Sequence, residues 1–463
     1  MVLVFIREGK CVKIETNQNS LQLEPKASDS FTSTGFILAA IGSSVGLGNM
    51  WKFPYITGMY GGAAFFLIFI LCLALVGLPI LLAEMVIGRG GRGNAVSSFH
   101  NLSKTKWWGY FGFLSVLSAF AIMGFYAVVA GWTMNYAFTS LTGNLFENPD
   151  YTASFLSFAG GNMPIFWTII TLIITCWVVA KGVAGGIEKF NKVLIPGLAV
   201  ILVILMIRAL TLPGAGEGVE FFLMPDFSKL TAESALVALG HAFFSLSLGM
   251  GAMLTYGAYT SKKQSLGKAA AAVAGGDLLY AFVAGLIIFP TVFSYGIAPG
   301  QGPGLAFMAL PAAFAAMPLG NLFGFLFFFL LSIAALTSTV SLVEVPNAYL
   351  MERFKWSRAK SATIVTLIIF AISIPASMSM GILSDNLLFG KTFFDLLDFV
   401  ASNIFLPIGG LVVTLFTGYA WKRAGEEAGL SGFWYNAWMF CLKYIAPIMV
   451  IVIFLYSIGI IKF

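Results

Sequence analysis

Long apolar runs separated by short polar segments fill the chain from about residue 35 to its end. Most are long enough to cross a bilayer as a helix, which takes roughly 20 apolar residues. They lack the two-residue alternation of a membrane β-barrel. An uncharged apolar stretch within 302–317 predicts a short re-entrant or surface helix. We predict about eleven transmembrane helices, at 35–57, 62–88, 109–138, 164–181, 190–210, 233–260, 270–296, 319–351, 360–381, 392–421 and 434–461.

Composition agrees with an all-α polytopic membrane protein. Of 463 residues, 59% are hydrophobic and only 10% are charged, whereas soluble proteins are about 25% charged. The net charge of +6 does not indicate nucleic acid, because the basic residues lie in short loops between apolar runs. The four cysteines are too scattered to predict a disulfide or metal site.

The basic residues also predict how the chain is oriented. The basic-poor loops hold only Arg208, Lys229 and Lys391. Because basic loops stay in the cytoplasm, we expect a multi-pass membrane protein with its N-terminal tail, residues 1–34, inside. The basic-rich loops carry Arg89, Arg92, Lys104 and Lys106; Lys181, Lys189 and Lys192; Lys262, Lys263 and Lys268; Arg353, Lys355, Arg358 and Lys360; and Lys422 and Arg423.

Two of the predicted spans contain segments that are poor helix interiors. The first reads Gly-Ser-Ser-Val-Gly-Leu-Gly-Asn at 42–49, and the sixth reads Ser-Leu-Ser-Leu-Gly-Met-Gly at 245–251. Both share the pattern Ser-x-x-Leu-Gly, and the two spans are first in successive sets of five. Paired interrupted helices are typical of inverted-repeat transporters. The alternative is close helix packing through small residues.

An interrupted helix frees backbone groups that lipid cannot satisfy, so they must line protein or a watery cavity. Freed N–H groups favour an anionic ligand group, and carbonyl and hydroxyl oxygens favour a small hard cation. Asp277, at the start of the seventh span, is a candidate because an acid at membrane depth is costly. It could instead lie near the cytoplasmic surface beside Lys268. We expect no metal cluster and no phosphate-binding loop, and hence no enzyme.

Three segments resemble the neurotransmitter:sodium symporter family: Gly46–Tyr55 with Gly61–Phe65, Ala242–Gly249, and Ala334–Ser338. The resemblance runs from about Gly35 to the end. It extends to bacterial amino-acid transporters with eleven spans, especially those that carry several hydrophobic amino acids. It implies a LeuT-type 5+5 inverted repeat with broken helices 1 and 6. The implied parts are a first five-helix repeat at 35–210, an extracellular loop at 211–232, a second repeat at 233–421, and a loop with an eleventh helix at 422–463.

The resemblance implies two sodium ions. The first would bind Ser44, Asn49, Ser245 and Asp277, where many members have Asn at the last position. The second would bind the carbonyls of Gly42, Val45 and Ala334 with the hydroxyls of Thr337 and Ser338. The tyrosine and glutamine of the family's chloride site fall at Phe69 and His241. Since Asp277 could supply the missing negative charge, we expect chloride-independent transport.

The resemblance also implies a substrate pocket and two gates. Tyr126 would bond a substrate carboxylate, Phe244 would close over it, and the absence of an acid at Gly46 favours a zwitterion. Lys52 with Asp398 would form the outer gate, and Glu352 would belong to the inner gate. The Arg and Trp expected before the first helix are absent from residues 25–31. The pocket would comprise Ser43, Leu47, Gly48, Ile122, Tyr126, Phe244, Ser247, Met250, Ser338 and Leu342.

We therefore expect a sodium-coupled symporter that imports neutral, bulky hydrophobic or aromatic L-amino acids by alternating access. Proton coupling through Asp277 or His241, a betaine or amine substrate, and a channel remain alternatives. The sequence does not predict the oligomeric state.

Overall fold

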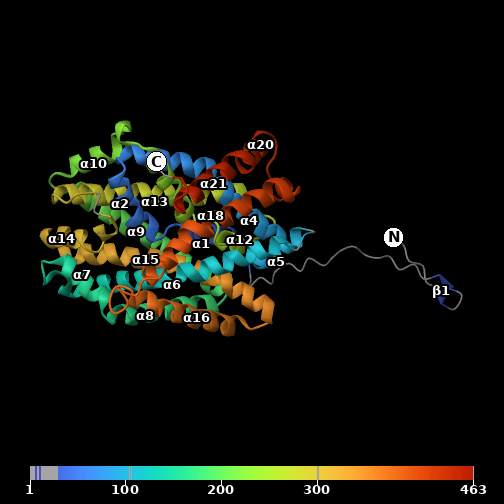
Figure 1. Ribbon diagram of the computed structural model, residues 1–463, viewed down its shortest axis with the longest axis horizontal. Helices are drawn as coiled ribbons and strands as arrows, with labels where there is room; N and C mark the ends of the chain where they lie inside the picture. Colours follow the sequence, from blue (N-terminus) through green and yellow to red (C-terminus); the bar gives the residue numbers. More distant parts are fainter. Residues whose placement is uncertain are drawn as a thin grey trace.

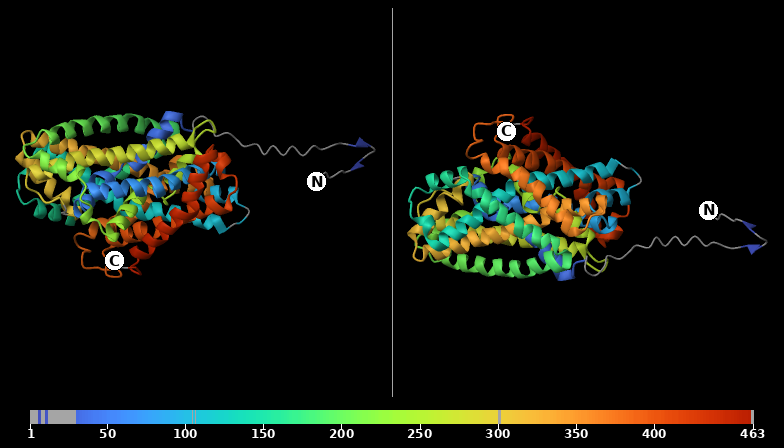
Figure 2. Two further views of the ribbon diagram at one scale, coloured as in Figure 1. Left: turned by 90° about the horizontal axis from the view of Figure 1, so that it is seen from above. Right: turned by 90° about the horizontal axis from the view of Figure 1, so that it is seen from below.

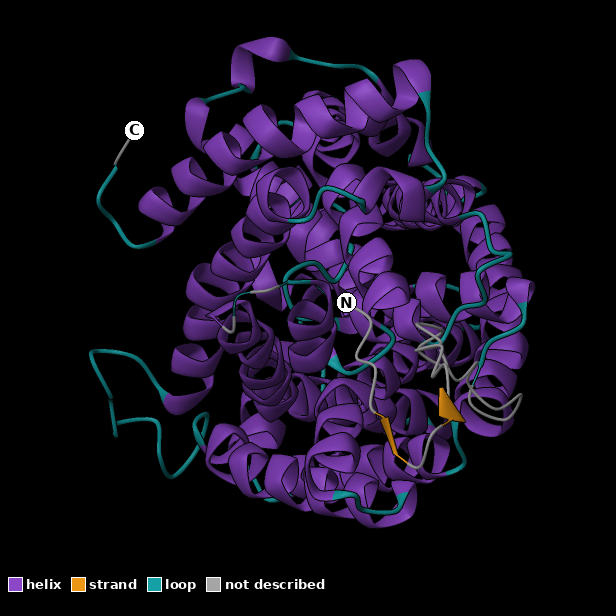
Figure 3. Cartoon of the chain, turned by 90° about the vertical axis from the view of Figure 1, so that its right-hand side faces the viewer, coloured by secondary structure: helices purple, strands orange, loops and turns teal. Residues whose placement is uncertain are grey.

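Helices that run nearly parallel to one another form the body of the computed structural model (Figure 1). Two further views and a view along the helices show the same bundle from its other sides (Figures 2 and 3). The structure describes residues 6–7, 10–11, 30–103, 105, 107–299 and 302–461. Within these residues, nine helices are long and apolar enough to cross a membrane.

The first five spans follow the predicted positions closely. The first span is divided into two helical parts. A π-helical turn lies within the second span and another lies at the start of the fifth. In order, they are α1 (Ser33–Ser44), η2 (Gly48–Lys52) and α2 (Phe53–Met59); α3 (Ala63–Cys72), η3 (Leu73–Gly77) and α4 (Leu78–Gly91); α6 (Trp107–Thr142); α8 (Met163–Ala180); and η5 (Val183–Glu188) with α9 (Lys189–Leu210).

The second half repeats this plan with a divided sixth span. Together with the nine long helices, the two divided spans give the eleven that were predicted. In order, they are α11 (Ala232–Ser245) and α12 (Ala252–Ala258); α13 (Leu266–Ser294); α15 (Gly320–Phe354); α16 (Arg358–Met378); α17 (Phe393–Phe399), η8 (Val400–Phe405), α18 (Leu406–Leu415) and η9 (Phe416–Ala420); and α20 (Gly432–Phe440), η10 (Cys441–Ile445) and α21 (Ala446–Ser457).

Short elements connect the spans. The helix expected within 302–317 is confirmed by η7 (Gly302–Leu305) and α14 (Ala309–Ala316). The other connecting helices were not predicted, because they are too short to cross a membrane. The remaining elements are β1 (Ile6–Arg7), β2 (Lys10–Cys11), α5 (Ala95–Leu102), η4 (Asn144–Phe146), α7 (Tyr151–Gly160), α10 (Ala215–Leu223), η6 (Phe227–Lys229) and α19 (Ala424–Ala428).

The two predicted interruptions are real breaks in the helices. α1 ends at Ser44, and helical structure resumes only at Gly48. Between α11 and α12, Ser247, Gly249 and Gly251 have φ angles of 55°, 78° and 76°. Glycine adopts this left-handed region without the Cβ clash that other residues suffer, so Gly249 and Gly251 permit the break.

The breaks lie inside the bundle. The most hydrophobic stretch of α15 is 83% buried and that of α6 is 72% buried, whereas that of the span formed by η5 and α9 is only 22% buried.

The two ends of the bundle carry different elements. We call the end that carries α5 and the loops after α8, α12 and α15 the basic end; it lies on the right of Figure 1. The opposite end carries α7, α10 and α14 on the left.

Candidate functional site

The two breaks and the middles of α6 and α15 enclose a central cavity. All of the residues predicted to bind substrate line it except Leu47. Leu47 is buried beside the cavity and contributes its backbone amide instead of its side chain. Gly46, Ser44 and Ser245 complete the lining, which otherwise consists of Ser43, Gly48, Ile122, Tyr126, Phe244, Ser247, Met250, Ser338 and Leu342.

One corner of this cavity is suited to an anionic group. The N–H of Leu47, freed by the first break, donates to Tyr126 Oη at 3.2 Å. A Cβ built on Gly46 would lie 2.7 Å from Ser338 Oγ and 3.0 Å from Tyr126 Oη. Glycine at this position therefore leaves room beside a phenol and freed amides, which together favour a carboxylate.

Serine hydroxyls join the two breaks to α15. Ser247 and Ser338 both donate to the carbonyl of Ser43, at 2.9 and 3.3 Å. Ser43 Oγ donates to Ser341 Oγ at 2.7 Å. These bonds satisfy groups that the breaks leave without helical partners. Ser341 was not predicted, although it lies three residues beyond Ser338 on the same face of α15.

Three of the four residues predicted for the first sodium ion lie in mutual contact. Asn49 Nδ2 donates to Asp277 Oδ1 at 2.8 Å, and Ser245 Oγ lies 2.7 Å from both Asn49 Oδ1 and Asp277 Oδ1. All three side chains are buried, Asp277 completely. Asp277 therefore lies within the bundle and not at the surface beside Lys268. Ser44, the fourth residue, is buried and donates to Ala40 O at 3.2 Å.

These side chains fit a small cation. Carboxylate, amide and hydroxyl oxygens are the hard donors that such ions prefer. When Asp277 is ionised, the cluster holds one negative charge in a buried site, where an opposite charge is needed to compensate its lost hydration.

The residues predicted for the second ion lie where α1 meets α15. Thr337 and Ser338 both donate to Ala334 O, at 3.0 and 3.2 Å, which is the ordinary backbonding of hydroxyls in helices. Val45 caps α1 with a non-helical ψ of 81°, where the helix carbonyls become free. Gly42 packs on α9, since a Cβ there would overlap Asn191 Oδ1.

At the opposite end, the predicted outer gate is not an ion pair in this structure. Lys52 Nζ lies 5.1 Å from the ring centre of Phe244, and Asp398 Oδ1 accepts a hydrogen bond from Ser402. His241 is 2% exposed, and neither ring nitrogen has a hydrogen-bond partner among the described residues.

At the basic end, Glu352 lies against the N-terminus of α5. Its Oε2 accepts from Asn94 N at 3.0 Å, from Asn94 Nδ2 at 2.6 Å and from Ser97 Oγ at 3.0 Å. These are donors that a helix N-terminus leaves unsatisfied. Sequence reasoning missed Asn94, although an Asn directly before a helix is a recognisable N-cap.

A second acid at the basic end makes an ion pair. Glu344 is fully buried, and its Oε2 lies 2.7 Å from an Arg358 guanidinium nitrogen. Tyr259 Oη donates to Glu344 Oε1 at 2.6 Å. Glu84, by contrast, accepts from the backbone N–H of Gly249 at 2.6 Å, so it supports the second break.

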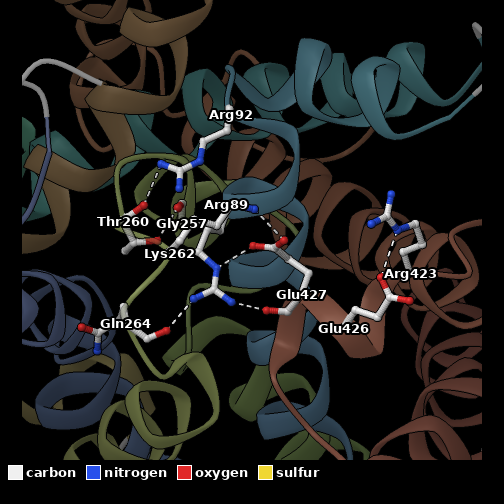
Figure 4. A network of polar contacts seen from close by, with 9 residues as sticks. All are labelled: Arg89, Arg92, Gly257, Thr260, Lys262, Gln264, Arg423, Glu426 and Glu427. Atoms are coloured by element: carbon white, nitrogen blue, oxygen red, sulfur yellow. Dashed lines mark hydrogen bonds and ion pairs between the residues drawn. The ribbon is translucent and has the colours of Figure 1, made fainter. Parts of the chain in front are cut away.

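A third polar network ties α4 to α19 and to the loop after α12 (Figure 4). Arg89 Nε lies 2.7 Å from Glu427 Oε1, and the same guanidinium donates to the carbonyls of Glu427 and Gln264. Lys262 Nζ lies 2.7 Å from Glu427 Oε2. Nearby, Arg92 donates to Thr260 O at 2.8 Å.

The central cavity is narrow and has a wider cavity on each side. Its volume is about 20 Å³. The cavity at the basic end, lined by Tyr259, Glu352 and Arg358, has a volume of about 390 Å³. The cavity at the opposite end, lined by Lys52, His241 and Asn403, has a volume of about 240 Å³. This arrangement is that of an occluded site between two vestibules.

Known proteins resemble the chain over nearly its whole length. The model of the "Sodium:neurotransmitter symporter family" matches residues 29–149 and 158–463. The "Uncharacterized sodium-dependent transporter YhdH" of Bacillus subtilis is 41% identical, with 93% of this chain and 97% of that protein aligned. An uncharacterized sodium-dependent transporter of Haemophilus influenzae is 35% identical, with 91% and 96% aligned. The crystal structure of MhsT in complex with L-phenylalanine is similar at a TM-score of 0.87 and 45% identity, covering 93% of this chain and 99% of that one.

Proposed function

Because this chain belongs to the sodium:neurotransmitter symporter family, whose members are sodium-coupled transporters and not enzymes, we propose that it imports bulky neutral L-amino acids together with sodium. The observation that carries the proposal is the pairing of an anion-binding corner with a cation-binding cluster at one cavity. Tyr126 with the freed amide of Leu47 would hold the substrate carboxylate. Asn49, Ser245 and Asp277 would hold a sodium ion near that carboxylate.

The lining supports a hydrophobic side chain. Ile122, Phe244, Met250 and Leu342 contribute apolar walls, and methionine adapts to different shapes. The related MhsT binds L-phenylalanine. We infer that the side chain of a large aliphatic or aromatic amino acid lies among these four residues. Gly46 leaves no acid to bind a lone amine, which argues against amine substrates.

Two sodium ions are proposed, one at each predicted set of ligands. The second would lie between the end of α1 and the Ala334–Ser338 turn of α15, so it would link the first break to α15. Loss of that ion would remove one link between α1 and α15 and leave the hydrogen bonds that join Ser43 to Ser338 and Ser341. A ligand shifts such an equilibrium only by binding one state more tightly than the other.

Transport is proposed to be independent of chloride. Asp277 is buried against Asn49 and Ser245, so its carboxylate can balance the charge of the neighbouring ion directly. Phe69 and His241 pack against each other, with ring centres 5.1 Å apart, in a region rich in phenylalanine. Phe69 offers no hydrogen-bond donor to an anion.

The basic end is proposed to face the cytoplasm of a bacterial cell, as the basic loops predict. Substrate would then enter through the vestibule beside Lys52 and leave through the one beside Glu352.

Equilibrium binding of tritiated L-phenylalanine and glycine to the purified protein tests this proposal. Phenylalanine should bind in sodium gluconate as tightly as in sodium chloride, and much more weakly in choline chloride. Stimulation by chloride at constant sodium would contradict the role given to Asp277. Binding that does not depend on sodium, or that favours glycine, would contradict the proposed site.

A further inference from the structure

Two tryptophan–lysine pairs meet at the basic end, where α8 and α16 lie side by side (Figure 1). Lys181 Nζ lies 3.6 Å from the ring centre of Trp177, at the end of α8. Lys360 Nζ lies 4.8 Å from the ring centre of Trp356, at the start of α16. Arg358 joins the two helices, since its guanidinium donates to Val179 O at 3.5 Å. The two pairs therefore border one surface.

This surface is strongly basic. Lys181, Arg353, Lys355 and Lys360 are exposed, and none makes an ion pair among the described residues. The segment 353–360 contains no acidic residue, and the charge of Arg358 is already compensated by Glu344. Four exposed cations on neighbouring helix ends create a positive potential that attracts an anion.

The same surface is also apolar. Trp177 is 58% exposed and Phe354 is 52% exposed, and Phe354 stacks on Trp356 with ring centres 4.8 Å apart. Exposed apolar side chains continue along both helices, with Ile173 at 61% and Leu367 at 60%. A soluble anion would leave this apolar surface unused, whereas an anion carried on acyl chains would cover it. Tryptophan is enriched where the headgroups of a bilayer meet its hydrocarbon.

We propose that this Trp–Lys surface, made of Trp177, Lys181, Arg353, Phe354, Lys355, Trp356 and Lys360, binds an anionic phospholipid. Lys181 and Lys360 contact its phosphodiester, and its acyl chains lie along α8 and α16. Lysine suits this role because its ammonium is a compact charge on a long apolar stem. The proposal goes beyond transport and does not depend on which amino acid is carried.

The Trp–Lys surface lies next to the cavity at the basic end. Trp356 and Arg358 both line the cavity at the basic end. Arg358 holds Glu344, which in turn accepts the hydroxyl of Tyr259. Lys360, which would contact the headgroup, thus lies two residues after Arg358, whose ion pair with Glu344 borders the cavity at the basic end.

Native mass spectrometry of the full chain in detergent, titrated with dioleoylphosphatidylglycerol or dioleoylphosphatidylcholine, tests the proposal. The variant carrying Lys181→Gln and Lys360→Gln removes the two lysines. A variant carrying Lys263→Gln and Lys268→Gln is the matched control, because both lysines are exposed at the basic end but lie elsewhere, Lys263 in the loop after α12 and Lys268 in the first turn of α13.

We expect the natural protein to retain phosphatidylglycerol in preference to phosphatidylcholine. The Lys181/Lys360 variant should bind phosphatidylglycerol about tenfold more weakly, since each lysine near a lipid phosphate strengthens binding several-fold. The control should bind as the natural protein does. Equal retention of the two lipids, or an equal loss in both variants, would overturn the proposal. Displacement of the lipid by an equal concentration of glycerol phosphate would overturn the assignment to a lipid.

Discussion

At the basic end, ion pairs join elements from different parts of the chain: Arg89 and Lys262 to Glu427, and Arg358 to Glu344. At the opposite end, the ion pair between Asp226 and Lys229 stays within one short turn among the described residues. There, Lys52 lies over Phe244 instead of meeting Asp398. The basic end is thus held by charge and the opposite end by aromatic packing.

This difference bears on how an occluded site opens. Breaking a partly buried ion pair costs several kcal/mol, because each charge then lacks its partner. A cation over an aromatic ring at a surface contributes only about 0.5–1 kcal/mol. The described structure should therefore open more readily at the opposite end. If that end faces outward, as proposed, the occluded protein is biased toward loading from outside.

Glu344→Ala should destabilise the protein most, by about 3 kcal/mol, because it leaves the Arg358 side chain, which is only 15% exposed, without its partner. Thermal unfolding in detergent would show this as a lower Tm. The double variant Glu344→Ala with Arg358→Ala should recover part of the loss. A double variant less stable than Glu344→Ala alone would show that the ion pair does not govern this region.

Arg89→Gln should cost about 2 kcal/mol, because Arg89 is 5% exposed and its guanidinium makes several charge-assisted hydrogen bonds. Lys262→Gln removes the other partner of Glu427. Because the Lys262 side chain is much more exposed than that of Arg89, this change should cost only about 0.5 kcal/mol. Comparing the two Tm values tests whether the network of Figure 4 depends on its buried member. Equal losses would contradict that assignment.

Lys52→Gln should change the Tm least, by the equivalent of about 0.5 kcal/mol, because Lys52 lies over a ring and makes no ion pair with Asp398. The vestibule at that end should nevertheless open more often. A cysteine placed at Asn403, which lines this vestibule, should react faster with a membrane-impermeant maleimide in the Lys52→Gln protein. An unchanged rate would mean that Lys52 does not restrain the vestibule that it lines.

Sequence alone predicted the spans and both breaks, because membrane helices and helix-breaking glycines leave strong local signals. It also predicted almost all of the cavity lining, but only through a resemblance to a family. Pattern alone could not place Asp277 beside Asn49, which is 228 residues away. Such contacts depend on how the whole bundle packs.

The contacts of the basic end were harder to predict. The resemblance gives Glu352 an arginine partner before the first helix, which this sequence lacks; among the described residues Glu352 meets Asn94 and Ser97 instead. The family's Arg and Trp would fall within residues 25–31, which contain neither, and of these 25–29 lie outside the described residues. The sequence placed Arg358 only in a basic loop. Its ion pair with Glu344 was not predicted, because the burial of Glu344 in the bundle depends on the folded chain.

The central claim is sodium-driven import of bulky neutral amino acids. Its most direct test is uptake of radiolabelled tryptophan, leucine and glycine into proteoliposomes, with an inward gradient of sodium or of choline and the pH gradient clamped at zero. The account predicts that tryptophan and leucine accumulate only with sodium, and more than glycine does. Accumulation that persists in choline, or that needs a proton gradient, would contradict it.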